Sequence, residues 1–192
     1  MTPGRRTRYA EHAPRYIIEP LAVAQWQATI IDIGFGSGES VVAAALARPD
    51  DRILGVEVHE AGITHLLTDL ARNDITNARV VRSDILEVMD HLATGSLREV
   101  CIFFPDPWPK VAHTQRRLVR ADVVESLTDR LALGGLLRLA TDADFYAAQM
   151  LEVCDNVPRL ERTEAPERVL TKYERRGRAA GRDIVDLAYR RI

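Results

Sequence analysis

The sequence predicts an α/β fold: a doubly wound, mostly parallel sheet of Rossmann-like type. Two observations support this prediction. The chain has 192 residues, 46% hydrophobic and 28% charged, as expected for one soluble globular domain. Short apolar runs rich in β-formers also alternate with longer helical patterns, which indicates βαβ units with helices on both faces of a parallel sheet.

The strands are expected where these apolar runs occur. We predict a single domain over residues 1–192, in which 1–28 form a short N-terminal arm, and a surface loop over the proline- and charge-rich stretch 158–168. Ligands of such folds gather at the carboxyl ends of the strands. The predicted strands are 29–33, 52–58, 78–82, 99–104 and 136–140.

Composition excludes several classes of protein. No apolar run approaches the roughly 20 residues of a membrane span, and the first residues do not resemble a signal peptide, so we expect a cytoplasmic protein. Cys101 and Cys154 lie in apolar contexts without metal-ligand spacing. We interpret both as core thiols and expect no metal site.

Basic residues are concentrated in three segments, although the net charge is −2. Residues 1–20 hold four basic and two acidic side chains, 110–120 hold four and none, and 168–182 hold six and one; the remaining chain has 12 against 25. Each segment alone is equally consistent with solvated surface charge. Together they are consistent with an RNA-binding groove if the fold brings them to one sheet edge.

A glycine-rich turn follows the first predicted strand. Gly34, Gly36 and Gly38 let the backbone turn tightly and approach a ligand closely. Their spacing differs from that of dinucleotide-binding loops, and Asp32 precedes them. A carboxylate repels a pyrophosphate but attracts the sulfonium and amino groups of S-adenosyl-L-methionine. The turn therefore predicts a site for this cofactor.

Two more acidic residues follow the next two strands. Glu57 is expected to accept hydrogen bonds from ribose hydroxyls, and Asp84 from the adenine amine, with Ile85 packed on the adenine ring. Each acid alone is as consistent with a helix cap or a loop charge. Acids at three successive strand ends favour cofactor binding.

Alternating prolines follow the fourth predicted strand, in 103–110 (FFPDPWPK). They fix the backbone and hold Asp106 at the strand end. Trp108 offers a face for base stacking, and Lys110 with Arg116 and Arg117 is expected to hold phosphates. The alternative is a purely structural loop, which needs neither an acid nor this much positive charge.

With these motifs, the sequence resembles the bacterial tRNA (guanine-N7-)-methyltransferases from about residue 30 onward. The proline-rich and TKYE motifs are more specific than the glycine turn. The matching stretches are 32–38 (DIGFGSG), 55–59 (GVEVH), 104–110 (FPDPWPK) with His113 and Arg116-Arg117, 141–142 (TD) and 171–177 (TKYERRG).

The resemblance implies a class I methyltransferase fold with a seven-stranded sheet, S-adenosyl-L-methionine as methyl donor with S-adenosyl-L-homocysteine as product, and tRNA as partner. It implies that Asp106 is catalytic and that a guanine in the variable loop accepts the methyl group. No obligate protein partner is expected, and a monomer and a homodimer are equally compatible. The implied cofactor residues are Asp32, Glu57, Asp84 and Asp106, beside Gly34 and Gly36 of the turn; the implied substrate residues are Lys110, Asp142, Thr171, Lys172, Tyr173 and Glu174.

The chemistry of guanine is consistent with this implication. N7 carries a lone pair and no proton, so the transfer needs positioning rather than a general base, and His113 is expected to be a loop hydrogen-bonding residue. A carboxylate such as Asp106 or Glu174 favours the cationic product and accepts from guanine N1 and N2. Two alternatives remain: methylation of a small purine-like metabolite, suggested by the apolar pair Val111-Ala112, and a cofactor-binding subunit without catalysis.

Overall fold

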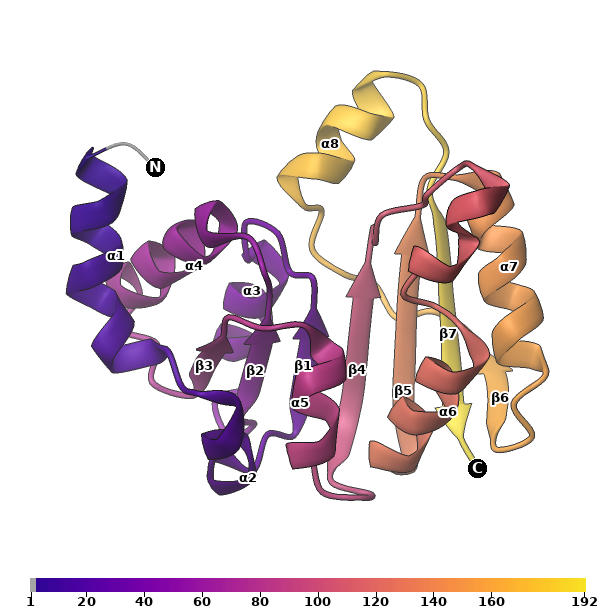
Figure 1. The fold of residues 1–192 in the computed structure, drawn as a ribbon, viewed down its shortest axis with the longest axis horizontal. Helices are drawn as coiled ribbons and strands as arrows, with labels where there is room; N and C mark the ends of the chain where they lie inside the picture. Colours follow the sequence, from indigo (N-terminus) through magenta and orange to yellow (C-terminus); the bar gives the residue numbers. More distant parts are fainter. Residues whose placement is uncertain (1–2) are drawn as a thin grey trace. The chain divides into compact units, whose positions relative to one another are not determined.

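The computed structural model describes residues 3–192, which form seven strands with flanking helices (Figure 1). The strands make a mostly parallel seven-stranded sheet, as the sequence predicts. The chain divides into two compact units, Met1–Ala93 and Thr94–Ile192. Within the described part of the chain, no helix combines the length and apolar character of a membrane span.

The first unit contains three parallel strands in the order β3-β2-β1. Asp32 of β1 is paired with Gly55 of β2, which is paired with Val80 of β3. Nearly every strand residue is buried, as is typical of parallel strands covered on both faces. The elements are β1 (Ile30–Ile33), β2 (Ile53–Val56), β3 (Ala78–Val81), α3 (Glu39–Ala47), α4 (Glu60–Arg72), α5 (Ile85–Val88) and the 3₁₀ helix η2 (Met89–His91).

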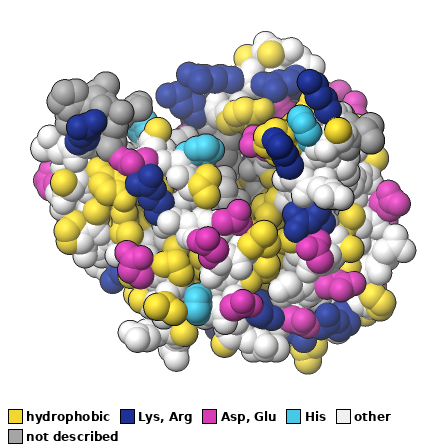
Figure 2. Space-filling model, viewed as in Figure 1, with side chains coloured by type: hydrophobic (Ala, Val, Ile, Leu, Met, Phe, Trp, Pro, Cys, Tyr) yellow, Lys and Arg dark blue, Asp and Glu magenta, His cyan; other side chains and the backbone are white. Residues whose placement is uncertain are grey.

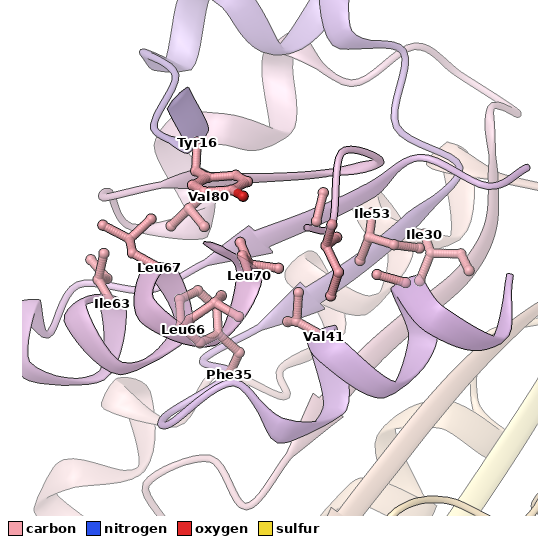
Figure 3. Packing of buried hydrophobic residues seen from close by; sticks show 13 residues of the cluster. Tyr16, Ile30, Phe35, Val41, Ile53, Ile63, Leu66, Leu67, Leu70 and Val80 are labelled. Atoms are coloured by element: carbon pink, nitrogen blue, oxygen red, sulfur yellow. The ribbon is translucent and has the colours of Figure 1, made fainter. Parts of the chain in front are cut away.

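Most of the predicted N-terminal arm is helical. Helix α1 (Pro3–Tyr16) packs on α4, and the Tyr16 side chain is fully buried in the apolar cluster of this unit (Figure 3). The 3₁₀ helix η1 (Pro20–Ala22) and α2 (Val23–Trp26) lead into β1. The first two residues of the arm lie outside the described residues.

The second unit contains four strands in the order β4-β5-β7-β6. β4 and β5 are parallel, whereas β7 is antiparallel to both of its neighbours. Helix α8 lies beyond the carboxyl ends of β4 and β5 (Figure 1). The elements are β4 (Leu97–Phe103), η3 (Val111–Arg116), α6 (Ala121–Arg130), β5 (Leu131–Thr141), α7 (Asp144–Asp155), β6 (Leu160–Thr163), α8 (Lys172–Ala179) and β7 (Val185–Arg191).

The five strands predicted from apolar runs are confirmed, with shifted ends. β5 begins at Leu131, five residues early, because Gly134 and Gly135 hide its first half from a strand pattern. The surface loop predicted for 158–168 is wrong in part, since it contains β6. That strand is short, lies at the sheet edge and buries only Leu160, so its sequence carries little strand signal.

Candidate cofactor and RNA sites

The glycine turn of the first unit has a backbone that side chains rarely adopt. Gly34, Gly36 and Gly38 have φ angles of +70°, +59° and +86°. A Cβ built at Gly34 or Gly36 would find no described atom within 4 Å, so the turn presents bare backbone to open space. This geometry fits the close approach of a ligand.

Two carboxylates border the turn. Asp32 is buried at the carboxyl end of β1. Glu57, just after β2, accepts hydrogen bonds through Oε1 from the amides of Val58 and His59, both at 2.8 Å, and through Oε2 from the amide of Gly36 at 3.1 Å. Glu57 therefore fixes the shape of the glycine turn. This second role was not evident from the sequence, and the predicted ribose contact stays a prediction.

Gly62 of helix α4 contacts the same turn. A Cβ at this position would lie 2.0 Å from the carbonyl oxygen of Gly36. Only glycine allows α4 to approach so closely. Sequence reasoning missed this residue, although a glycine inside a helical pattern is a known sign of close packing.

Asp84 is exposed and caps helix α5, because its Oδ1 accepts from the amide of Leu86 at 2.9 Å. The expectation that Ile85 packs on adenine is wrong, since Ile85 is 3% exposed in the core. Leu86 and Val58 are the apolar side chains exposed next to Asp84 and Glu57, at 45% and 50%. The helical turn after Asp84 rotates Ile85 inward and Leu86 outward.

In the second unit, the proline-rich motif forms a bent loop after β4. Phe104 and Trp108 have φ angles of +54° and +41°, which are strained for residues with a Cβ. Asp106 lies between them with an exposed side chain. The motif is therefore held in an unusual conformation around Asp106, as expected of a functional segment.

The two adjacent arginines after this loop, Arg116 and Arg117, differ in exposure and in their contacts. The guanidinium of Arg116 lies 4.9 Å from the centre of the Trp108 ring, and His113 meets that ring edge-on at 5.6 Å. Lys110 is exposed nearby in the chain. Arg117, in contrast, is buried and donates to backbone carbonyls of the motif. The expectation that Arg117 holds a phosphate is therefore wrong, because the loop folds back over its side chain.

The structure brings Asp142 and Tyr173 together. Asp142 accepts hydrogen bonds from Arg182 and from the Tyr173 hydroxyl, the latter at 3.3 Å. The Tyr173 ring packs on Phe104, with 5.3 Å between ring centres. Three segments that carry predicted site residues therefore meet in the second unit. Lys172 is exposed beside Tyr173 on α8.

Thr171 and Glu174 fix helix α8 itself. Thr171 caps the helix by accepting from the Glu174 amide at 3.1 Å. The Glu174 side chain is fully buried, with one oxygen bound by Arg168 and the other by Arg178. Burial alone would raise the pKa of Glu174, but hydrogen bonds from these two arginines outweigh it and hold the pKa below its ordinary value.

Lysine and arginine side chains gather over α8 in Figure 2. Helix α8 carries four exposed basic residues, and Arg182 follows the helix; the four on the helix are Lys172, Arg175, Arg176 and Arg178. No group of three or more metal-binding side chains was found over residues 3–192. The prediction that the enzyme uses no metal stays a prediction.

The sequence is similar to that of known methyltransferases over most of its length. A family model described as a putative methyltransferase matches residues 26–187. The tRNA (guanine-N(7)-)-methyltransferase of Burkholderia ambifaria is 42% identical over 98% of this chain and 80% of its own length. The chain belongs to this family. The enzyme of the same name from Alkalilimnicola ehrlichii is 45% identical over 84% of the chain and 72% of its own length.

Solved structures of other methyltransferases confirm the fold of this chain. The aminoglycoside resistance methyltransferase NpmB1 has a TM-score of 0.64 at 16% identity, covering 90% of this chain and 93% of its own. A putative methyltransferase from Streptococcus mutans, solved with S-adenosyl-L-homocysteine, has a TM-score of 0.60 at 11% identity, covering 88% and 93%. The chain therefore has the class I methyltransferase fold.

Proposed function

We propose that the protein transfers a methyl group from S-adenosyl-L-methionine to N7 of a guanine in tRNA, within the variable loop. The observation that carries this proposal is the similarity over 98% of the chain to an enzyme named for that reaction. The motifs that carry predicted site residues also occupy strand ends, where ligands of this fold bind. No observation favours a small purine-like metabolite as the acceptor.

The first unit supplies residues that suit the cofactor. The open backbone of Gly34 and Gly36 allows a ligand to approach closely, and Asp32 offers a buried negative charge to a cationic group. Glu57 and Asp84 are assigned to the ribose and the adenine amine. When bound, the cofactor supplies an electrophilic methyl group.

Asp106 is the carboxylate best suited to the guanine. It is exposed, whereas the oxygens of Glu174 are bound by two arginines in a buried position. Guanine N7 needs no deprotonation, so the enzyme's task is to orient the base and stabilise the positive charge that develops on it. We assign both tasks to Asp106, which also has a predicted contact with the cofactor.

The second unit supplies contacts for the tRNA backbone. Lys110 and Lys172 are exposed cations, Arg116 is held over Trp108, and Tyr173 of α8 is hydrogen-bonded to Asp142. Each phosphate that such a cation neutralises steepens the salt dependence of binding by about 0.7 to 0.9 in log–log slope. Contacts of Thr171 and Glu174 with tRNA stay predictions beside their role in building α8.

The test is the transfer of labelled methyl groups from S-adenosyl-L-methionine to unmodified tRNA by the purified protein. The modified RNA is then cleaved chemically at 7-methylguanosine. We expect one cleavage site, in the variable loop, and transfer that persists in excess chelator. Label in free purine nucleosides with none in tRNA would favour the small-molecule alternative, and cofactor binding without any turnover would favour a non-catalytic subunit.

From this reaction we infer a cytoplasmic location, where a tRNA substrate is available. The oligomeric state, monomer or homodimer, is a separate prediction. Sedimentation of the purified protein with and without tRNA tests it.

A further inference from the structure

Arg117 is 8% exposed, and its side chain is surrounded by fixed partners. Its Nε donates to the Pro107 carbonyl at 2.9 Å, its Nη2 donates to the Trp108 carbonyl at 3.0 Å, and its Nη1 donates to the amide oxygen of Gln149. The guanidinium also lies over two aromatic rings of α7, 5.1 Å from the Phe145 centre and 5.5 Å from the Tyr146 centre. Each of its nitrogens is thus bound within the protein.

The two carbonyls that Arg117 binds follow Asp106 directly. Proline has no N–H, so the carbonyl is the only backbone group of Pro107 that a hydrogen bond can fix. Trp108 has a φ of +41°, a conformation that persists only when its surroundings impose it. Arg117 supplies that constraint at both residues.

Helix α7 anchors Arg117 in turn. The Gln149 amide nitrogen donates to the Val119 carbonyl at 3.0 Å, and the Tyr146 hydroxyl accepts from the Val119 amide at 3.1 Å. The loop that carries Asp106 is thereby connected through Arg117 to a rigid helix. A guanidinium fits this position because its planar fork donates in several fixed directions, which an ammonium does not.

We propose that Arg117 is a positioning residue for methyl transfer, which holds Asp106 in place by fixing the Pro107–Trp108 turn. It does not bind RNA phosphate, whereas its neighbour Arg116 does. This inference rests on the proposed function, because it concerns the geometry of the same reaction.

The two adjacent arginines form a matched pair for kinetics. Arg117→Gln and Arg117→Lys should both lower the single-turnover rate at saturating tRNA, by about tenfold to 100-fold, since small misplacements of reacting groups cost that much. Both should leave the salt slope of tRNA binding unchanged.

Arg116→Gln should instead raise the KM for tRNA and flatten the slope, and Arg116→Lys should restore the slope because a phosphate contact needs only the charge. Arg162→Gln, an exposed arginine of β6, is the surface-charge control.

A second measurement reports on the loop itself. The chain has two tryptophans and five tyrosines, so in a Trp26→Phe background Trp108 is the sole tryptophan and is excited selectively at the red edge of its absorption, where tyrosine does not absorb. Arg117→Gln should make Trp108 more accessible to acrylamide. Gln149→Leu, which removes one partner of Arg117, should shift the rate and the quenching in the same direction. Gln149→Glu keeps the acceptor for Arg117 but loses the hydrogen bond to the Val119 carbonyl, so it should restore both only in part. The Gln149 pair decides the matter if Arg117 variants do not fold, as judged by thermal melting and cofactor binding.

Two results would overturn the inference. One is a folded Arg117→Lys variant with a normal single-turnover rate, because a lysine cannot reproduce the fork. The other is a reduced salt slope in Arg117 variants equal to that of Arg116→Gln. Failure of the wild-type protein to methylate tRNA refutes the proposed function instead, and in that case the quenching results still decide whether Arg117 holds the loop.

Discussion

Arg168 donates a hydrogen bond to Glu174, and the two side chains are 8% and 0% exposed. Arg168 also pairs with Asp186 of β7 and lies over the rings of Phe103 and Phe104, 5.2 Å from each centre. This one arginine therefore joins α8 to the sheet and to the end of β4. The order of α8, and of the basic side chains that it presents, depends on a buried ion pair.

Glu174→Gln should destabilise α8, because it removes the buried negative charge that pairs with both Arg168 and Arg178 and leaves Arg168 paired with Asp186 alone. Breaking a buried ion pair costs about 3 kcal/mol or more. The pKa of Glu174 is lowered in the folded state, so its stabilising contribution is present above the ordinary carboxyl pKa of 4.5 and is lost as the pH falls through the folded value. Hydrogen exchange of α8 amides at pH 7 and below pH 4.5 measures both effects.

The matched control is Glu161→Gln, an exposed glutamate of β6. It should leave the exchange of α8 unchanged at both pH values. Unaltered protection of α8 in Glu174→Gln would contradict the structural role assigned to this carboxylate.

Gly62→Ala should abolish or strongly weaken cofactor binding. The added methyl would lie 2.0 Å from the Gly36 carbonyl oxygen, so the glycine turn or α4 must move. Calorimetric titration with S-adenosyl-L-homocysteine measures the loss. Ala61→Ser, at the exposed neighbouring position of α4, should bind normally; wild-type affinity in Gly62→Ala would mean that the turn adapts without cost.

Asp106→Asn should lower kcat for tRNA methylation by about 100-fold, as removal of one group that stabilises transition-state charge typically does. Asparagine keeps the size of the side chain but removes the negative charge. The affinity for the cofactor should change little, because the buried acid and the glycine turn of the first unit are intact. Asp183→Asn, at another exposed aspartate, is the control, and full activity in Asp106→Asn would remove Asp106 from the catalytic role.

Cys154 should resist thiol reagents in the folded protein. Burial, together with the charge of Asp155, raises the pKa of its thiol to about 12. At pH 8 only roughly one thiol in ten thousand is then ionised, and the thiolate is the reactive form. Cys101 is also buried. Titration with a chromogenic disulfide should find both thiols only after denaturation, and rapid reaction of the native protein would contradict this expectation.

Much of the fold could be predicted from local patterns. The strands that end at Ile33, Val56 and Val81 are mostly apolar, because parallel strands buried on both faces hold few polar residues. β6 and β7 gave no such signal. Both lie at the antiparallel end of the sheet, where charged residues such as Glu161 and Arg190 remain exposed.

The sequence motifs of the candidate site could be predicted, but most of the side-chain contacts within it could not. The glycine turn and the proline-rich loop are recognisable in the sequence. Glycine marks positions where the backbone adopts conformations closed to other residues, and proline fixes the backbone wherever it occurs. The hydrogen-bond partners of Glu57, Asp84 and Glu174 could not be predicted, because a carboxylate accepts from backbone amides, arginines or ligands alike. Whether these residues contact cofactor and tRNA is a prediction for the experiments above.

The order of the βαβ units could be predicted from the spacing of apolar runs along the chain, and the resemblance of the glycine, proline-rich and TKYE motifs implied the family and the segments that carry the chemistry. Which of two adjacent arginines faces solvent depends on the tertiary structure. Arg117 is buried because it packs against α7, where its partner Gln149 lies 32 residues further along the chain. Arg116, in contrast, is exposed. Burial depends on packing between distant segments, and no local pattern encodes it.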